Sequence, residues 1–327
     1  MGHILRFLIT GDRGFIGHNV VRLLEAQGHS IYGIDYNTNY GFIPNAELYY
    51  LYKLRNKRCL SPTVCYNIVS ERVDVAFKRA QAETVIHLAS FPRQKIVNNN
   101  PLCASDVMTT GLINLLEHAV KHKIRRFVYI SSSMVYGDFV SGVNEAAQCN
   151  PQGQYAILKY MGEKLVQDYA RRTGMEYVII RPSAVYGEND VEDRVVSKFI
   201  VAALRNEVLR VHGANEVLDF THVDDTALGI AQAALSPNAA NKIYNITRSD
   251  TTEHSLLDAA NLIVNIAGAG SIEVDGRDLN FPSRGNLDIA AARRDFGFNP
   301  TIDITHGFKR YYDWYRQHPT LWRSKAV

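Results

Sequence analysis

The sequence lacks the features that mark membrane-spanning, secreted and nucleic-acid-binding proteins. None of its 327 residues lies in an apolar run near the roughly 20 residues that a membrane-spanning helix needs. The opening stretch, MGHILRFLITGDRG, predicts a strand that runs into a glycine turn and not a signal peptide. The net charge is only +3, and no basic block stands out. Neither nucleic acid nor a membrane is therefore expected as a partner.

Cysteine is scarce as well. The four cysteines, Cys59, Cys65, Cys103 and Cys149, show no metal-ligand spacing, so we expect no metal site and free thiols in a reducing cytoplasm. The chain has no repeat and no low-complexity linker. Its composition, 46% hydrophobic and 21% charged, is that of an ordinary globular protein. The length suffices for one large domain or two joined ones.

Strand-like and helix-like segments alternate through the first half of the chain. Apolar strands are expected at residues 4–10, 30–35, 82–90, 124–133 and 175–183. Helix-length segments stand between them, as at 15–28, while the basic insert at 37–60 predicts a surface helix. This alternation predicts an α/β protein built on a Rossmann-like, doubly wound parallel sheet.

After about residue 185 the alternation loosens. A helix is expected at about 255–266, and an aromatic helix closes the chain. We expect a smaller C-terminal substrate-binding lobe. The predicted division gives residues 1–182 to the domain that contains the sheet, with 221–247 returning to it, and gives 183–220 and 248–327 to the lobe.

The stretch TGDRGFIG joins the first strand to the first helix. Gly11, Gly14 and Gly17 permit a tight turn, a close approach of backbone to a pyrophosphate, and packing of helix on strand. The next strand ends at Asp35, whose carboxylate can bind ribose hydroxyls and repel a 2′-phosphate. NAD is therefore the expected cofactor, with NADP as the alternative because Arg13 stands in the same loop.

Three tyrosine–lysine pairs with a spacing of four residues are candidates for proton transfer: Tyr49–Lys53, Tyr155–Lys159 and Tyr160–Lys164. Tyr160 shares a helical face with charged residues, and Tyr49 lies in a basic surface segment. Tyr155 and Lys159 instead share a helical face with small and apolar residues. A lysine is rare on such a buried face unless it has a specific role. The sequence therefore predicts that Tyr155 and Lys159 form the catalytic pair.

Three serines, Ser131 to Ser133, stand at the end of the strand expected at 124–133. In an open parallel sheet, ligands bind beyond the carboxyl ends of the strands. A serine there and a tyrosine at the start of the next helix can converge on one substrate oxygen. Such a trio can remove a hydroxyl proton while a nicotinamide takes the hydride.

The chain resembles the extended short-chain dehydrogenase/reductase family, specifically its NAD-dependent nucleotide-sugar epimerases and dehydratases. The resemblance runs nearly end to end and rests on these stretches: TGDRGFIG, VIHLAS, SSSMVYG, YAILK followed by Glu163, IIRPSAVYGEND, LDFTHVDD and the closing helix. It implies Ser132, Tyr155 and Lys159 as catalytic residues, with Ser133 as the rival serine. It implies cofactor contacts from Gly11, Arg13, Gly14, Phe15, Ile16, Gly17, Asp35, Asn67, Leu88, Ala89, Tyr155, Lys159 and Pro182. It implies substrate contacts from Ser90, Ser132, Ser133, Tyr155 and Arg284.

Several positions depart from the family pattern. Asn67 replaces an acidic residue that usually meets adenine, and Met108 replaces a common asparagine. Leu218 and Ala184 replace an arginine and an asparagine at the nucleotide end of the substrate site. Arg284 is a candidate to supply the missing charge to a diphosphate, or it is a surface residue.

The resemblance implies an epimerase that works through a transient keto-sugar on a nucleotide-diphosphate sugar, and a homodimer. A net 4-dehydrogenase or ketoreductase is the alternative. A 4,6-dehydratase is less expected, because Ser133 and Met134 stand where dehydratases carry Asp-Glu. A non-catalytic NAD-binding sensor is disfavoured, because such proteins usually lose the tyrosine or the lysine.

Overall fold

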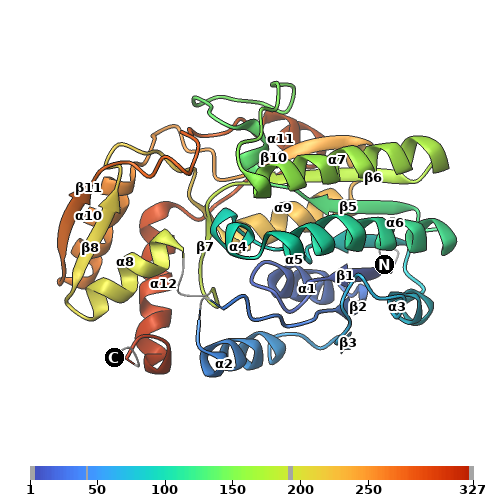
Figure 1. Ribbon diagram of the computed structural model, residues 1–327, viewed down its shortest axis with the longest axis horizontal. Helices are drawn as coiled ribbons and strands as arrows, with labels where there is room; N and C mark the ends of the chain where they lie inside the picture. The colour runs from blue at the N-terminus through green and yellow to red at the C-terminus, as the bar shows by residue number, and fades with distance from the viewer. Residues whose placement is uncertain (1–3, 42, 191–193, 324–327) are drawn as a thin grey trace.

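A parallel sheet of seven strands forms the centre of the computed structural model, which describes residues 4–41, 43–190 and 194–323 (Figure 1). The strands lie in the order β10-β6-β5-β4-β1-β2-β3. Their bounds are β1 (Arg6–Thr10), β2 (Ser30–Ile34), β3 (Thr63–Val64), β4 (Thr84–His87), β5 (Arg126–Ile130), β6 (Glu176–Pro182) and β10 (Lys242–Ile246). Every residue of β4 and β5 is buried, because helices cover both faces of the sheet.

Two helical layers enclose this sheet and confirm the predicted Rossmann-like, doubly wound fold. On one face lie α1 (Gly17–Ala26), α9 (Val223–Leu235) and α11 (Ala290–Phe296). On the other face lie α3 (Val73–Ala80), α6 (Gly111–Lys121) and α7 (Gln154–Thr173). Two short helices, α4 (Gln94–Asn99) and α5 (Pro101–Ser105), and a π-helical stretch at 106–110 lead from β4 to α6. In the described part of the chain, each helix is too short or too polar to cross a membrane.

The predicted smaller lobe is present beside the carboxyl ends of the strands (Figure 1). It contains α8 (Val195–Leu204), β8 (Val208–His212), α10 (Leu256–Ala267), β11 (Ser271–Asp275) and α12 (Ile304–Gln317). The two strands pair in parallel, and the lobe has its own core, to which Phe199, Ile263 and Phe308 belong. The short pair β7 (Val185–Tyr186) and β9 (Thr221–His222) marks two of the chain's crossings between domain and lobe.

The chain crosses between domain and lobe more often than the sequence suggested. The expected return of 221–247 brings α9 and β10 to the sheet. Residues 289–298 return as well and differ from the predicted division, because Ile289, Ala292 and Phe298 lie in the core of the larger domain. Small alanine side chains let α11 approach closely, and this packing cannot be read from local periodicity.

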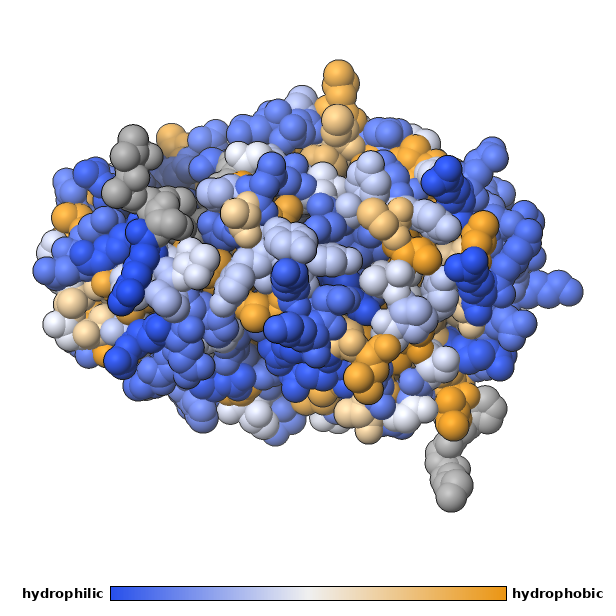
Figure 2. Space-filling view, turned by 90° about the horizontal axis from the view of Figure 1, so that it is seen from below, coloured by the Kyte–Doolittle hydropathy of each residue, from blue (hydrophilic) through white to orange (hydrophobic). Residues whose placement is uncertain are grey.

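The insert after β2 also differs from its prediction as a surface helix. α2 (Asn45–Asn56) exposes Tyr49 but buries Leu51 completely in the core of the lobe. Arg55, expected among the surface charges, is buried. Figure 2 views the molecule from the α2 side, where the surface is mainly hydrophilic and the apolar residues are scattered. The apolar face of α2 is therefore turned inward, toward the lobe.

Candidate functional site

A cleft of about 1180 Å³ lies between the carboxyl ends of the strands and the lobe. Ligands of open α/β sheets bind at this edge. The glycine loop and the ends of β2, β4, β5 and β6 form one side, and residues of α8, β8 and the segment 278–284 form the other. Every residue that the sequence analysis assigned to catalysis, cofactor or substrate lines this cleft.

The glycine loop has the shape that a dinucleotide needs. Gly11 has a φ of +73°, and a Cβ there would lie 2.7 Å from the Ala89 nitrogen. A Cβ on Gly17 would lie 2.0 Å from the Gly11 oxygen, so the start of α1 could not pack against the loop. No larger residue fits at either position. The N-terminus of α1 therefore stands close enough to the cleft for its amides to meet phosphate groups.

Asp35 lies at the end of β2, where the cleft would receive a ribose. Its Oδ2 accepts from the Arg13 backbone N–H at 2.9 Å, and its Oδ1 accepts from the Asn37 N–H at 2.7 Å. Burial raises the pKa of Asp35, while these backbone bonds and the charges of Arg55 and Arg13 act to lower it. The carboxylate is thus fixed in orientation before any ligand arrives.

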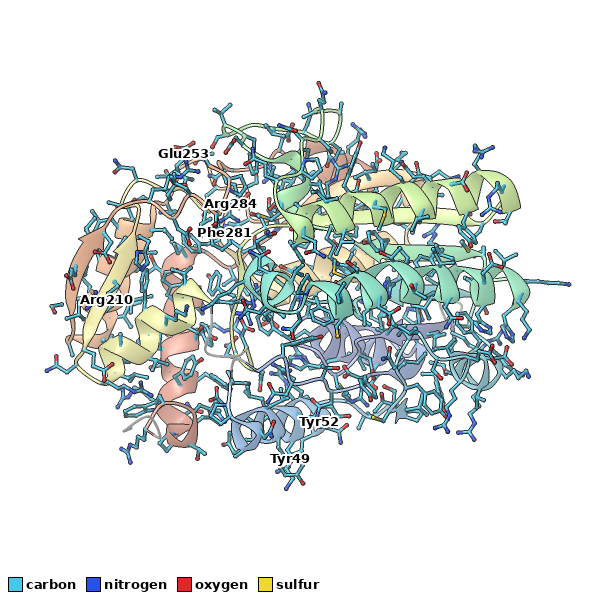
Figure 3. The ribbon with its side chains drawn as sticks, in the orientation of Figure 1. Tyr49, Tyr52, Arg210, Glu253, Phe281 and Arg284 are labelled. Atoms are coloured by element: carbon cyan, nitrogen blue, oxygen red, sulfur yellow. The ribbon has the colours of Figure 1, made fainter. Side chains whose placement is uncertain are left out.

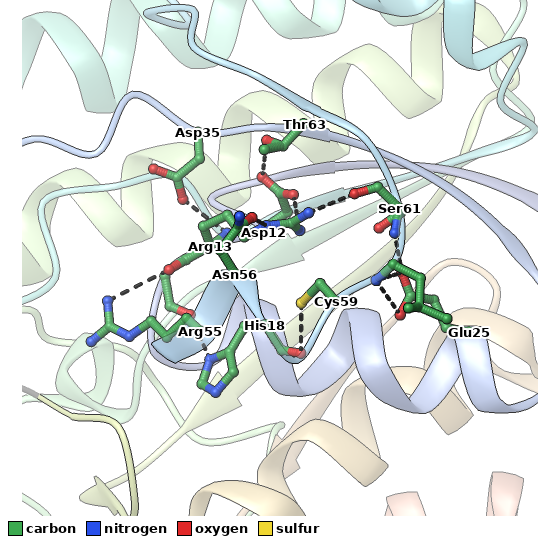
Figure 4. Close-up of polar contacts among 12 residues, drawn as sticks. Asp12, Arg13, His18, Glu25, Asp35, Arg55, Asn56, Cys59, Ser61 and Thr63 are labelled. Atoms are coloured by element: carbon green, nitrogen blue, oxygen red, sulfur yellow. Dashed lines mark hydrogen bonds and ion pairs between the residues drawn. The ribbon is translucent and has the colours of Figure 1, made fainter. Parts of the chain in front are cut away.

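The Arg13 side chain turns away from Asp35 and into the protein (Figure 4). All three guanidinium nitrogens donate, to Asp12 Oδ2 at 2.5 Å, to Asn56 Oδ1 at 2.9 Å and to the Ser61 carbonyl at 2.6 Å. The side chain is only 2% exposed. Its charge is therefore committed to internal partners and is not presented to a 2′-phosphate.

Tyr155 and Lys159 enter the cleft from the first turns of α7. They are 8% and 5% exposed, whereas the lysines of the other two pairs are exposed. Lys159 Nζ donates to the Ile130 carbonyl at 2.8 Å and lies 6.0 Å from the centre of the Tyr155 ring. In each of the other pairs the lysine stacks over its own tyrosine outside the cleft.

Burial dominates the electrostatics of this pair. It raises the pKa of Tyr155, while a hydrogen bond with Ser132 and the charges of Arg194 and Arg93 act to lower it. Burial lowers the pKa of Lys159 to about 7, and the charge of Glu163 opposes that change. Neither arginine was predicted: Arg194 immediately precedes α8, and Arg93 lies in the loop after β4.

The three serines have different partners. Ser131 donates to Glu163 Oε1 at 2.5 Å. Ser132 accepts from the Met134 N–H at 3.2 Å and is the serine hydrogen-bonded to Tyr155. Glu163 is fully buried and receives two bonds from Arg181, at 2.9 and 2.7 Å. The geometry therefore separates a serine that faces the tyrosine from one that supports α7.

The remaining cofactor candidates and the substrate candidate Ser90 line the cleft with their backbone or local polar groups. Asn67 Oδ1 accepts from the Val69 N–H at 3.1 Å, and the Ser90 hydroxyl donates to the Phe91 carbonyl at 3.1 Å. Ala89 packs against Gly11, and Pro182 ends β6. These positions all line the cleft, with Asn67 following β3 at one end of the sheet and Pro182 ending β6 toward the other.

The lobe end of the cleft carries Arg284, which lies near Phe281 on the segment that passes over the cleft (Figure 3). Its Nε is buried without a hydrogen-bond partner among the described residues. Burial lowers the pKa of Arg284 to about 10, and Glu216 opposes that change. Leu218 is buried in the lobe core, and Ala184 has a φ of +38°. Arg284 is thus half-buried and directed into the cleft rather than spread on the surface.

Sequence reasoning missed several lining residues, among them Tyr40, Arg55, Arg194, Arg210 and Glu216. Tyr40 and Arg55 come from the insert after β2, which had no motif to mark it. Arg194, Arg210 and Glu216 come from lobe segments whose spacing is that of ordinary surface residues. Only the folded arrangement of lobe and domain brings them to the cleft.

A second group of polar side chains lies away from the cleft, between α3 and α6. The ligand atoms of Asp74, His118 and His122 lie within 4.8 Å of one another. Lys78 and Lys121 both contact the Asp74 carboxylate, at 2.7 and 2.9 Å. Two ammonium groups already neutralise this carboxylate, so the group is an ion-pair cluster that joins the two helices.

Comparison with known proteins shows which family this chain belongs to. A putative UDP-glucose 4-epimerase of Methanocaldococcus jannaschii is 30% identical over 95% of this chain and 98% of its own. A dTDP-glucose 4,6-dehydratase of Streptomyces niveus is 28% identical over 97% and 95%. The crystal structure of a UDP-glucuronic acid 4-epimerase from Bacillus cereus, in complex with UDP-glucuronic acid and NAD, has a TM-score of 0.86 at 25% identity over 95% of this chain and 99% of that one. The model of the NAD dependent epimerase/dehydratase family matches residues 7–247. The chain therefore belongs to this family, and its cofactor is NAD.

Proposed function

We propose that this protein is a nucleotide-sugar epimerase that inverts one sugar centre through a transient keto-sugar. The observation that carries the proposal is the contact of Tyr155 with Ser132, beside buried Lys159, in the same cleft as the glycine loop and Asp35. NAD, when bound, supplies the acceptor and the donor of hydride. Tyr155 removes the proton of the sugar hydroxyl, and Ser132 steadies the oxygen on which charge develops.

The chain's own charges favour this role for Tyr155. Its phenol has an ordinary pKa of about 10 and must lose its proton near neutral pH. Ser132, Arg194 and Arg93 all act in that direction against burial. Lys159 Nζ donates to the Ile130 carbonyl and lies beside the tyrosine ring, where it adds positive charge below its pKa of about 7.

Arg284 is our candidate for the substrate diphosphate. Its buried Nε has no partner among the described residues, and a guanidinium can bind phosphate oxygens in pairs. Ser90 and Ser133 are the candidates for sugar contacts. Arg284 therefore replaces the charge that Leu218 does not supply.

A net 4-dehydrogenase is the second candidate, and one observation favours it. Epimerisation needs a firm hold on the nucleotide while the keto-sugar turns over in the site. Leu218 is an apolar residue in the lobe core and gives the nucleotide no polar anchor. A weaker hold would release the ketone. A 4,6-dehydratase is disfavoured, because Ser133 and Met134 offer no carboxyl group to expel a hydroxyl.

The test is to incubate the protein with candidate nucleotide sugars and substoichiometric NAD. NMR follows the sugar centres, and absorbance follows NADH. Many turnovers per NAD with an inverted centre are expected of the epimerase. One equivalent of NADH per keto-sugar, without an inverted product, would favour the dehydrogenase. NAD binding without any reaction on a broad sugar panel would contradict both.

We also propose a homodimer built on α6 and α7 with the short helices before α6. Leu102 and Ile157 are 83% and 51% exposed on neighbouring elements of this face. Two-fold association would bury them on both subunits. Light scattering should give twice 36.8 kDa for the natural chain and a monomer for Ile157→Glu. Val140→Glu, at an exposed valine on the loop after β5, is the matched control and should stay dimeric.

A further inference from the structure

α2 lies between the two cores of the molecule. Leu51 is fully buried among the apolar residues of the lobe, and Tyr50 packs against the same cluster. The helix nevertheless belongs, by chain order, to the connection between β2 and β3 of the larger domain. Tyr49 and Tyr52 lie on α2 in Figure 3, which shows the helix beside the lower end of α12 and below the sheet. The helix thus packs on the core of the lobe while chain connectivity and polar contacts join it to the larger domain.

The buried residue Arg55 joins this helix to the entrance of the lobe. Its Nε and Nη2 donate to the Asn189 carbonyl at 3.0 and 2.6 Å, and its Nη1 lies 3.5 Å from the Arg13 carbonyl (Figure 4). Asn189 follows β7, on the segment that leads into the lobe, and its φ is +70°. One guanidinium therefore holds both the glycine loop and the strand-to-lobe connection.

The next residue of α2, Asn56, contacts the glycine loop through its side chain. Asn56 Oδ1 accepts from Arg13 Nε at 2.9 Å, and the Arg13 backbone N–H binds Asp35 at 2.9 Å. Burial lowers the pKa of Arg55, while Asp190 and Asp35 oppose this, so the guanidinium stays charged between the two carboxylates. The last turn of α2 is therefore linked, through Arg13, to the carboxylate that we expect to bind the ribose.

We propose that Arg55 is a positioning residue that couples cofactor binding at the glycine loop to the conformation of the lobe. A ligand that binds Asp35 further restrains the Arg13 backbone, which Asp35 already holds, and Arg55 passes this restraint to Asn189 and, through Leu51, to the lobe. By reciprocity, a ligand that closes the lobe strengthens cofactor binding by the same factor. This inference extends beyond the reaction proposed above and depends only on the binding of NAD.

Hydrogen exchange of the whole protein with and without NAD tests the coupling. In the natural chain, NAD should slow exchange in α8 and α12 of the lobe by about tenfold, a typical coupling factor. Arg55→Met should reduce that response to less than about twofold and should weaken NAD binding in calorimetry. Lys53→Met, on the exposed face of the same helix, is the control and should behave as the natural chain. A lobe response in Arg55→Met equal to that of the natural chain would overturn the proposal.

Two further variants keep the test decisive if Arg55→Met folds poorly. Arg55→Lys retains a charge but cannot bond both carbonyls in the same geometry. In Arg55→Lys, NAD should cause little slowing of hydrogen exchange in the lobe. The melting temperature should stay within a few degrees of that of the natural chain. Leu51→Ala leaves the Arg55 bonds intact and should lose the lobe response with nearly unchanged NAD affinity. A full response in both variants would reduce Arg55 to a structural role. The hydrogen-exchange test uses NAD and no sugar. Its result therefore stays valid even if the proposed epimerase reaction is wrong.

Discussion

Replacing Lys159 with methionine should make the protein more stable at neutral pH although it abolishes turnover. Burial moves the pKa of Lys159 from 10.5 to about 7. That difference corresponds to about 5 kcal/mol, the free energy by which the fold disfavours the charged ammonium. Methionine fills the same volume without a charge. The lost bond to the Ile130 carbonyl costs about 1 kcal/mol, and imperfect packing costs about as much again. The net gain should be about 2–4 kcal/mol.

The gain should depend on pH in one direction. Below about pH 7 the ammonium is charged in the folded and unfolded chain alike, so the full cost of burying it is present. Between about pH 7 and 10.5 only the unfolded chain keeps the proton, and the cost falls steadily as pH rises. The advantage of methionine should therefore be greatest at or below pH 7. It should disappear near about pH 9, where the remaining cost of about 2 kcal/mol equals the losses from the bond and the packing, and should reverse above that pH.

Urea denaturation of the cofactor-free protein at pH 6, 7.5 and 9 measures this difference. Lys164→Met, at an exposed lysine on the same helix, is the control and should change stability by less than about 0.5 kcal/mol. A Lys159→Met protein that is less stable than the natural chain at every pH would refute the reasoning. A gain that does not change with pH would show that burial of the charge is not its cause.

Three further outcomes are expected. Tyr155→Phe should lower turnover by about 10²–10⁴ with cofactor still bound, whereas Tyr160→Phe, outside the cleft, should be nearly silent; the reverse pattern in a rate assay would reject the assignment. NAD should bind at least about tenfold, or 1.4 kcal/mol, tighter than NADP, and Asp35→Ala should narrow that gap in calorimetric titration; a preference of the natural chain for NADP would contradict it. Ala184→Asn should raise the melting temperature, because asparagine tolerates a φ of +38° better than alanine; an unchanged or lower value in calorimetry would count against strain at this position.

The glycine loop, Asp35 and the Tyr155–Lys159 pair were predictable because each depends on local geometry. A turn between strand and helix, a strand end and a spacing of one helical turn are all properties of short segments. The choice of Ser132 among three adjacent serines came from the family resemblance, since local spacing does not distinguish them. In the structure Ser132 is the serine hydrogen-bonded to Tyr155.

The positions that escaped prediction depend on contacts between distant segments. Arg13 looked like a ligand for a 2′-phosphate, but Asp12, Asn56 and Ser61 draw its guanidinium inward. Arg55 looked like one of several surface charges, although the lobe entrance encloses it. In both cases a buried carbonyl or carboxylate, contributed from elsewhere in the chain, decides where the guanidinium lies.

The repeated crossings between domain and lobe have a consequence for how the protein is made. On a ribosome, the sheet lacks its β10 edge until residue 246 has emerged, and its core lacks Phe298 for another 52 residues. Until β10 has emerged and paired with it, β6 is an exposed edge strand that can pair with other chains. A nascent chain that stalls after residue 182 would therefore be an aggregation hazard rather than a small NAD-binding domain. Synthesis speed and chaperone access across the last third of the chain should control the yield of folded protein.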